Sequence, residues 1–348
     1  MATPIKDGAW LEWIAGLMGA ASRQRHTAML PPEKFHCLLD ELPVHLIPQH
    51  SLDRRLQRLD TSQLLFLNPE CLVLPAGVVP PELETHRELL EGFHLQRTVA
   101  WVRESGTGSL HPFWLGPRLA PLVSNLRRGE PVPASFPQAQ QVLLAAAGIL
   151  IPEDHAQRRH AEWSTIVNQR SQTFREKNYA PLGDLIHPFT LAALRRYYRH
   201  AIRRGAIWLG DEQSALRYVA HNEPVARYFH YQIAKAVAKI VGEPIKPSYV
   251  YLASYMSGAE LKKHTDREQC EFSVTLCLDF SPEPALATPW PIRLDTSAGT
   301  VTAYQALGDG LVYRGTRVPH YRDGLARGYT STSLFFHYVA ANFSGRLN

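Results

Sequence analysis

Residues 260–280 read ELKKHTDREQCEFSVTLCLDF, and two patterns meet in them. His264 and Asp266 stand two positions apart, and apolar residues then occupy every second position as far as Phe280. An alternation with a period of two is typical of a β-strand that buries one face. The side chains that we expect on this buried face are Phe272, Val274, Leu276, Leu278 and Phe280.

The spacing of His264 and Asp266 suits a chelate. On an extended strand successive side chains alternate between faces, so these two side chains point to the same side and can reach one cation. An isolated His-x-Asp pair is common by chance, so a third ligand is needed, and His320 in LGDGLVYRGTRVPH is the obvious candidate. Two histidines and one carboxylate on one face leave the other metal positions open, which is typical of non-haem Fe(II) oxygenases.

The chain divides into a first part that prolines punctuate and a second part with longer periodic elements. We place the boundary at residue 160, which gives domains of residues 1–160 and 161–348. In the first domain, LFLNPECLVL and TVAWVRES predict short strands, and QAQQVLLAAAG predicts a helix that ends at Gly148. This pattern loosely resembles the winged-helix peptide-recognition domains. An accessory domain that only buttresses the second domain is the alternative.

Two helices are predicted at the start of the second domain. One begins near Pro188 and ends at Gly205, and the other ends at Gly242. The first carries five arginines beside its apolar stripe, and we expect them on a solvated face; they are Arg195, Arg196, Arg199, Arg203 and Arg204. Strands separated by glycine and proline turns follow. Helices before antiparallel strands indicate an α+β fold with a barrel or sandwich.

The composition describes an ordinary globular chain. Its 348 residues are 45% hydrophobic and 20% charged, which allows a large buried core. The net charge of +5 is too small to identify a nucleic-acid partner. Four cysteines match neither a zinc site nor a disulfide framework, which suits a reducing compartment.

The beginning of the chain, residues 1–26, combines an apolar patch with the charges of Asp7 and Glu12. We interpret this segment as an amphipathic helix and not as a signal peptide. No uninterrupted apolar run of membrane-spanning length follows. We therefore expect a cytoplasmic protein with no membrane partner.

Four segments together resemble the 2-oxoglutarate- and Fe(II)-dependent dioxygenases, most closely the prolyl-hydroxylase-like branch. They are YLASYMSGAELKKHTD, EFSVTLCLDF, LGDGLVYRGTRVPH and STSLFFHYV. The resemblance implies a double-stranded β-helix of the jelly-roll or cupin type, braced by helices. It implies Fe(II) held by His264, Asp266 and His320, with 2-oxoglutarate and dioxygen as cosubstrates and with Tyr255 helping to hold 2-oxoglutarate.

The anchor for the far carboxylate of 2-oxoglutarate departs from this family's pattern. The family usually places an arginine or lysine nine or ten positions after the distal histidine, where this sequence has Tyr329. We predict Arg327 as the anchor, with Ser331 as a hydroxyl partner and Ser333 as the alternative to it, because a small shift of the turn would bring that arginine to the strand. Arg322 is the other nearby base, but it follows His320 by only two positions. A guanidinium can bind a carboxylate through two parallel hydrogen bonds.

These observations favour an enzyme, a 2-oxoglutarate-dependent hydroxylase that acts on an amino-acid-like unit, free or within a peptide or protein, and releases succinate and CO2. An enzyme of the same superfamily that modifies nucleic acid is one alternative. The sequence shows no interleaving of aromatic and basic residues that would favour it. A cupin-like module that binds a ligand without catalysis is the other alternative.

Overall fold

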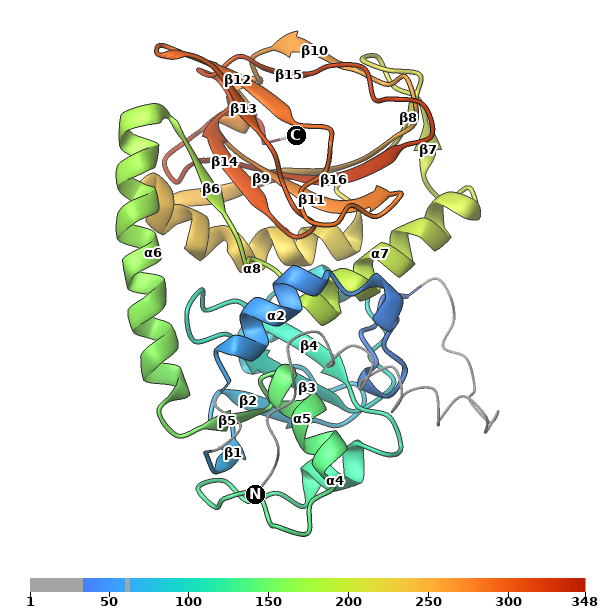
Figure 1. The fold of residues 1–348 in the computed structure, drawn as a ribbon, viewed down its shortest axis with the longest axis vertical. Helices are drawn as coiled ribbons and strands as arrows, with labels where there is room; N and C mark the ends of the chain where they lie inside the picture. The colour runs from blue at the N-terminus through green and yellow to red at the C-terminus, as the bar shows by residue number, and fades with distance from the viewer. Residues whose placement is uncertain (1–33, 60–62, 348) are drawn as a thin grey trace.

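The computed structural model describes residues 34–59 and 63–347. The amphipathic helix predicted for residues 1–26 lies outside the described residues. The strands of the second half of the chain gather at one end of the molecule, and the first half lies at the other end (Figure 1). Two helices, α7 (Pro188–Arg203) and α8 (Pro224–Val241), lie between them, and α6 (His155–Lys177) runs along the side of both.

Two facing sheets form the second half of the described chain. The larger has the strand order β6-β14-β11-β16-β9-β8-β7 and the smaller the order β10-β15-β12-β13. The larger sheet contains β6 (Tyr179–Leu182), β7 (Trp208–Leu209), β8 (Arg217–His221), β9 (Ile245–Tyr255), β11 (Phe272–Ser281), β14 (Gly310–Arg314) and β16 (Thr330–Ala340). The smaller contains β10 (Leu261–His264), β12 (Ile292–Thr296), β13 (Gly299–Ala303) and β15 (His320–Arg322).

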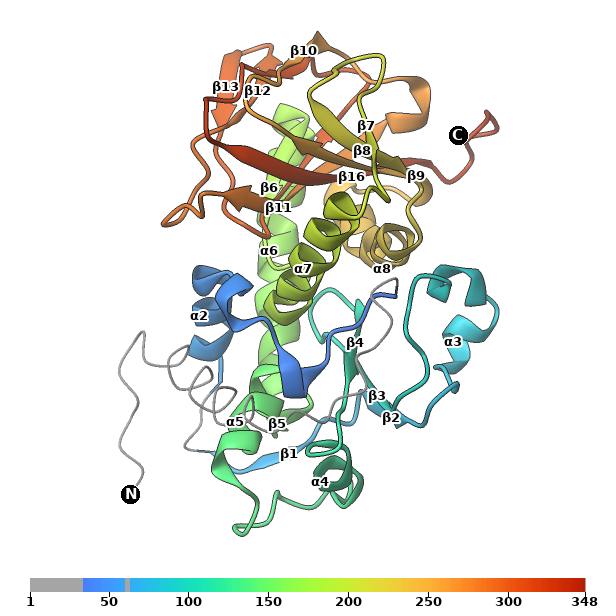
Figure 2. The ribbon, with the colours of Figure 1, turned by 90° about the vertical axis from the view of Figure 1, so that its right-hand side faces the viewer.

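The order in which the chain visits the two sheets defines the fold. From β9 to β16 it crosses between the larger and the smaller sheet at every step except the β12–β13 hairpin, and the strand pairs are antiparallel. Such a winding is a double-stranded β-helix, a jelly-roll barrel. The predicted fold class is therefore confirmed. Figure 2 shows α7 and α8 under the outer face of the larger sheet.

The alternation predicted for β11 is correct as far as Leu278. Its first four apolar residues are buried in the cluster that also contains the apolar sides of α7 and α8. The pairing with β16 then shifts register between Cys277 and Asp279, which is a β-bulge. Because the bulge reverses the faces, Phe280 packs inside the barrel with Tyr255 and Trp290. The prediction for Phe280 is wrong for this reason.

The expectation of a solvated arginine face on α7 is wrong for Arg195 and Arg199, because Asp279, which follows the bulge, lies against that helix. Arg195 is completely buried, and its Nε donates to Asp279 Oδ1 at 2.8 Å. Arg199 donates to both carboxylate oxygens of Asp279, at 2.6 and 2.8 Å. Arg203 and Arg204 are exposed, as expected. The periodicity of the helix alone cannot reveal that an acid from another element lies against it.

The first half of the described chain combines a three-stranded sheet, β2-β3-β4, with the pair β1-β5. Its strands are β1 (Leu65–Leu67), β2 (Cys71–Leu74), β3 (Val99–Arg103), β4 (Leu110–Trp114) and β5 (Leu150–Pro152). Its helices are α2 (Gln49–Gln57), α3 (Pro81–Glu84), α4 (Ala120–Ser124) and α5 (Gln138–Ala146), with 3-10 turns η1 (Leu39–Glu41), η2 (Val44–Leu46) and η3 (Arg87–Leu90). The predicted strands are present, and α5 ends before Gly148, whose φ is +75°.

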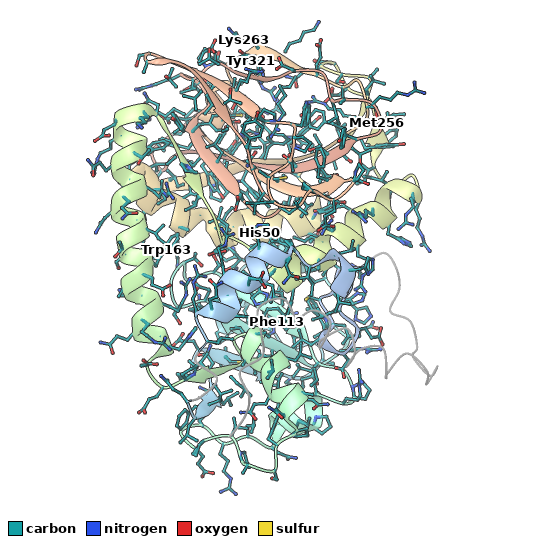
Figure 3. All side chains as sticks on the ribbon, in the orientation of Figure 1. His50, Phe113, Trp163, Met256, Lys263 and Tyr321 are labelled. Atoms are coloured by element: carbon teal, nitrogen blue, oxygen red, sulfur yellow. The ribbon has the colours of Figure 1, made fainter. Side chains whose placement is uncertain are left out.

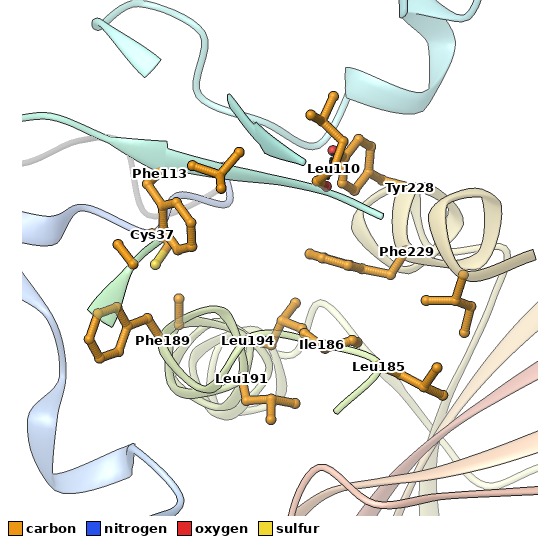
Figure 4. Close-up of a cluster of buried hydrophobic side chains, with 14 of the residues drawn as sticks. Cys37, Leu110, Phe113, Leu185, Ile186, Phe189, Leu191, Leu194, Tyr228 and Phe229 are labelled. Atoms are coloured by element: carbon orange, nitrogen blue, oxygen red, sulfur yellow. Dashed lines mark hydrogen bonds between the residues drawn. The ribbon is translucent and has the colours of Figure 1, made fainter. Parts of the chain in front are cut away.

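A single cluster of buried apolar residues extends through both halves. Figure 4 shows the part of it where Phe113 of β4 meets Leu194 of α7 and Phe229 of α8. Residue 160, the predicted domain boundary, falls inside α6. The division into domains of residues 1–160 and 161–348 stays a prediction.

The four cysteines are all free and buried. None of the helices that the structure describes combines the length and the apolar character needed to cross a membrane.

Candidate metal centre

Two neighbouring strands of the smaller sheet each bring a histidine into the barrel. His264 is the last residue of β10 and His320 the first of β15, and they are partners in the register of the two strands. Their neighbours Lys263 and Tyr321 lie together on the outer face, with Lys263 Nζ 5.1 Å from the centroid of the Tyr321 ring (Figure 3). Because side chains alternate along a strand, the histidines point inward. Their ring centroids are 4.4 Å apart.

Asp266 reaches the two histidines from a loop. β10 ends at His264 and the 3-10 turn η4 (Glu268–Cys270) begins two residues after Asp266, so a shared strand face is not what brings His264 and Asp266 together. Asp266 Oδ1 lies 3.6 Å from His264 Nε2 and 3.5 Å from His320 Nε2. The three ligand atoms are within 4.8 Å of one another. The sequence-predicted ligands thus converge on one point.

Backbone carbonyls fix the imidazoles in the tautomer that a metal requires. His264 Nδ1 lies 2.7 Å from the carbonyl oxygen of Lys262, and His320 Nδ1 lies 3.0 Å from that of Val318. A carbonyl only accepts, so each Nδ1 carries the proton and each Nε2 presents its lone pair. Both Nε2 atoms are the ones that face Asp266.

The electrostatics of the group also suit a cation. Burial opposes ionisation of Asp266, but the neighbouring imidazoles of His264 and His320 outweigh it and lower the pKa of the carboxyl to about 2. The Asp266 carboxylate raises the pKa of His264, whereas burial lowers the pKa of His320. The ionised carboxylate faces two imidazoles in a confined space, and a divalent cation can bind all three.

Two residues that the sequence analysis did not single out position Asp266. Ser273 Oγ donates to Asp266 Oδ2 at 2.8 Å. The carbonyl oxygen of Gly315 accepts from the backbone N–H of Asp266 at 2.9 Å. A Cβ on Gly315 would lie 2.2 Å from Asp266 Oδ2, so only glycine fits there. In the sequence Gly315 stands five residues before His320, but only the contact with the loop that carries Asp266 explains why a glycine is needed there.

A cavity of about 590 Å³ opens beside these residues. Tyrosine and phenylalanine rings form part of its wall, and its charged residues include two adjacent pairs, Asp211 with Glu212 and Asp266 with Arg267. Among the residues that line it are Asp211, Arg217, Tyr249, Tyr255, Cys270 and His337. A concave site with an aromatic wall and a few charges is the usual form of a small-molecule site.

The structure does not bring Arg327 to this cavity. Arg327 is exposed on the turn before β16, next to Gly328 with its φ of +85°. Neither Arg327 nor Arg322 is among the residues that line the cavity. Arg322, which shares the inward face of β15 with His320, is 4% exposed. The role of Arg327 as the anchor stays a prediction, and its exposed position on the turn gives that role no support.

Arg322 lacks a counter-ion among the described residues. Its Nη1 donates to the carbonyl oxygen of Trp290 at 2.5 Å and its Nη2 to Gln305 Oε1 at 3.1 Å, while Nε has no partner. Burial lowers the pKa of this guanidinium, and the neighbouring Tyr255 and Cys277 oppose the shift. A buried cation without a paired anion is costly. The environment of Arg322 therefore suits an anionic ligand.

The two other predicted cosubstrate residues lie in the barrel interior. Tyr255 of β9 is 1% exposed, lines the cavity, and accepts a hydrogen bond at 3.1 Å from Arg217 Nη1. Ser331 of β16 is buried opposite Tyr255 in the register. Ser333, two residues further on, has a buried hydroxyl without a partner, and it pairs in register with Cys277. Ser333 thus resembles Arg322 in offering an unused polar atom.

Arg217 is also buried, but its charge is already matched. Its Nε donates to Asp211 Oδ2 at 3.0 Å, and the two residues form an ion pair. The hydroxyl of Tyr251 donates to the same carboxylate oxygen at 2.5 Å. Arg322 is therefore the stronger candidate for binding an anion.

Comparison with known proteins gives likenesses of fold at low sequence identity. No protein-family model matches the chain, and no curated protein sequence matches it. A solved non-heme alpha ketoglutarate dependent epimerase, SnoN from nogalamycin biosynthesis, is similar with 13% identity and a TM-score of 0.42, over 51% of this chain and 84% of that one. A Pseudomonas putida prolyl-4-hydroxylase has 15% identity and a TM-score of 0.40, over 49% and 98% of the two chains. EctD from S. alaskensis has 14% identity and a TM-score of 0.41, over 49% and 76%. Because these TM-scores lie below 0.5, function has to be inferred from the residues of the metal centre.

Proposed function

We propose that this protein is a 2-oxoglutarate- and Fe(II)-dependent oxygenase. The observation that carries the proposal is the meeting of His264, Asp266 and His320, with one carboxylate oxygen within 3.6 Å of two imidazole nitrogens. Two histidines and a carboxylate on one face, beside an open cavity, leave coordination positions for a cosubstrate and dioxygen. With 2-oxoglutarate and dioxygen, bound iron supplies the oxidising power that breaks an unactivated C–H bond, while 2-oxoglutarate is converted to succinate and CO2.

The residues of the chain have separable roles in this proposal. His264 and His320 present Nε2 to the metal, and Asp266 neutralises part of its charge. Ser273 and Gly315 hold Asp266 in place. Tyr255 lines the cavity beside these residues and would contact a cosubstrate bound there.

We further propose that Arg322 and Ser333 bind the far carboxylate of 2-oxoglutarate. Both are buried and each has a polar atom without a partner. Ser333 is the register partner of Cys277, and Arg322 lies on the inward face of β15. A carboxylate that reached beyond the residues lining the cavity to this point would pair the unmatched guanidinium of Arg322.

The substrate that we propose is an amino-acid-like unit, free or within a peptide or protein, and the reaction is its hydroxylation. The mouth of the cavity offers both signs of charge, with Glu212 on the β7–β8 connection and Arg267 directly after Asp266. An ammonium group and a carboxylate of one ligand can both find partners there.

Nucleic acid is a weaker candidate because the arginines of α7 are largely engaged. Arg195 and Arg199 bind Asp279, and Arg195 is completely buried. That helix therefore cannot present a continuous basic face to phosphates.

For the first half of the chain we propose a bracing role beneath the barrel, because it shares its apolar cluster with α7 and α8. A winged-helix-like role in peptide recognition is the alternative. A cytoplasmic location stays our prediction, since four buried free thiols suit a reducing compartment.

The test is a turnover assay with purified protein, Fe(II), oxygen and 2-oxoglutarate across free amino acids and short peptides. We expect succinate together with a product that is heavier by one oxygen atom in mass spectra. Asp266→Ala and His264→Ala should abolish both, because each removes a ligand without removing core volume. Lys263→Ala is the matched control, since Lys263 lies on the outer face of the same strand (Figure 3). Succinate formation by Asp266→Ala at the rate of the unaltered protein would contradict the proposal.

A further inference from the structure

A second set of metal-ligating side chains lies beside the first. Asp266, Cys270 and His337 bring a carboxylate oxygen, a sulfur and a ring nitrogen within 4.8 Å of one another. All three line the cavity, so a cation from solution can reach them. We propose that they form a second metal position, suited to a thiophilic divalent cation such as Zn²⁺, which shares Asp266 with His264 and His320.

Three separate elements meet at this second position. Asp266 comes from the loop after β10, Cys270 ends η4, and His337 lies on the inward face of β16. Ser273 of β11 connects them, because its Oγ lies 2.8 Å from Asp266 Oδ2, 2.9 Å from His337 Nδ1 and 3.3 Å from the carbonyl oxygen of Cys270. Cys270 and His337 are 2% and 7% exposed, so neighbouring groups constrain both side chains.

The contacts of Ser273 determine which nitrogen of His337 is free. A hydroxyl carries one proton, and Asp266 Oδ2 at 2.8 Å can only accept it. The contact of 2.9 Å between Ser273 Oγ and His337 Nδ1 is then a hydrogen bond in which Nδ1 donates. In that tautomer His337 Nε2 has its lone pair available, as a ligating histidine requires.

Hydrogen bonds around the sulfur of Cys270 also favour its binding to a metal. Arg267 Nη2 donates to the hydroxyl oxygen of Tyr249 at 3.3 Å, and that hydroxyl lies 3.0 Å from Cys270 Sγ. Arg267 has only donors, so the phenol proton is left to point at the sulfur. A donor aimed at sulfur stabilises a metal-bound thiolate.

The three donor atoms indicate which type of cation the second position prefers. One sulfur, one nitrogen and one oxygen suit Zn²⁺ or Co²⁺ better than the oxygen-preferring Mg²⁺ or Ca²⁺.

The two metal positions compete because they share Asp266. A cation at the second position binds the carboxylate that the first position also needs, and two divalent cations on one carboxylate repel each other. Occupation of the second position should therefore weaken metal binding by His264, Asp266 and His320. That consequence for iron rests on the proposed function, whereas binding at Cys270 does not.

Cobalt spectroscopy of the full, metal-free chain tests the second position directly. With Co²⁺ as the probe, we expect a thiolate-to-cobalt charge-transfer band that Zn²⁺ removes by displacement. Cys270→Ser should lose the band, and Cys71→Ser, which alters a buried thiol in the first half, should keep it. Absence of the band in the unaltered protein, or its persistence in Cys270→Ser, would overturn the inference.

Two further variants separate this position from the first one. The double variant His264→Ala/His320→Ala should retain the thiolate band, and its loss there would show that the two sets are not distinct positions. The affinity for Zn²⁺ should fall by about tenfold or more in Cys270→Ser. Cys270→Ala serves if the serine variant does not fold, as circular dichroism will show. A protein that shows the band but never forms succinate would retain the second position and lose the proposed function.

Discussion

Arg322 and Arg327 differ in burial, and that difference decides which of them can act on 2-oxoglutarate. Arg322→Ala should raise the 2-oxoglutarate concentration needed for half-maximal succinate formation by about 10- to 100-fold, because a hydrogen bond to a charged group contributes about 1.5–3 kcal/mol. Arg327→Ala is the matched control and should change this concentration little, since Arg327 is exposed. If Arg327→Ala has the larger effect, the anchor assigned to Arg322 is wrong.

Gly315 offers a second test at the scale of one atom. Gly315→Ala places a methyl group against Asp266 Oδ2, so we expect weaker Co²⁺ or Fe(II) binding with the far-ultraviolet circular dichroism unchanged. Gly324→Ala is the control, because a Cβ on Gly324 meets nothing within 4 Å. Equal metal affinities in the two variants would show that Gly315 does not position the ligand.

The sequence predicted which residues converge on the metal centre better than it predicted what surrounds them. His264, Asp266 and His320 belong to a pattern that spacing and neighbouring strands reveal. For the anchor we propose Arg322 in place of Arg327, because the side of β15 that a residue occupies bears on its place in the barrel more than its distance along the chain after His320. The spacing of two residues already places Arg322 on the same face of β15 as His320.

The bulge in β11 connects the barrel to the helix beneath it. Asp279→Ala should lower the free energy of unfolding by about 1.5–3 kcal/mol, since it removes one of the two carboxylates that pair with the buried Arg195 and leaves only Glu283. Arg203→Ala, on the exposed end of α7, should change it by less than about 0.5 kcal/mol. Urea unfolding of both variants measures the difference. A loss below about 1 kcal/mol in Asp279→Ala would mean that water replaces the missing carboxylate.

Among the elements, those with local signals were predictable. Pro188 begins α7, and the side chain of Glu223 caps α8 by accepting from the backbone N–H of Ala226. The bulge has no local signal, because it depends on the register between β11 and β16. The inversion at Phe280 and the burial of Arg195 both follow from that register, so neither was visible in the sequence.

At the scale of the whole molecule, buried histidines make stability depend on pH. Burial lowers the pKa of His111 to about 4 and that of His230 to about 3, and it also lowers the pKa of His187. As the pH falls through about 6.5, these histidines become protonated in the unfolded chain but stay neutral in the folded chain. The stability that they contribute is therefore full above that pH and falls as the pH drops towards 4. Each such histidine should contribute about 1 kcal/mol of this loss between pH 7 and 5.5.

Urea unfolding at pH 7 and pH 5.5 measures this loss. In a His111→Phe variant the difference between the two pH values should be smaller than in the unaltered protein, whereas an exposed histidine has no such effect. Equal stability at both pH values would contradict the buried neutral state of these histidines.

The apolar cluster shared by the two halves limits how this barrel can be used by itself. A fragment that begins at residue 161 would cut α6 after its first turns and strip the cover from the apolar sides of α7 and α8. Large uncovered apolar surfaces promote association between copies. The metal centre is thus not a portable module, and attempts to engineer or crystallise it separately would first have to redesign the underside of those two helices.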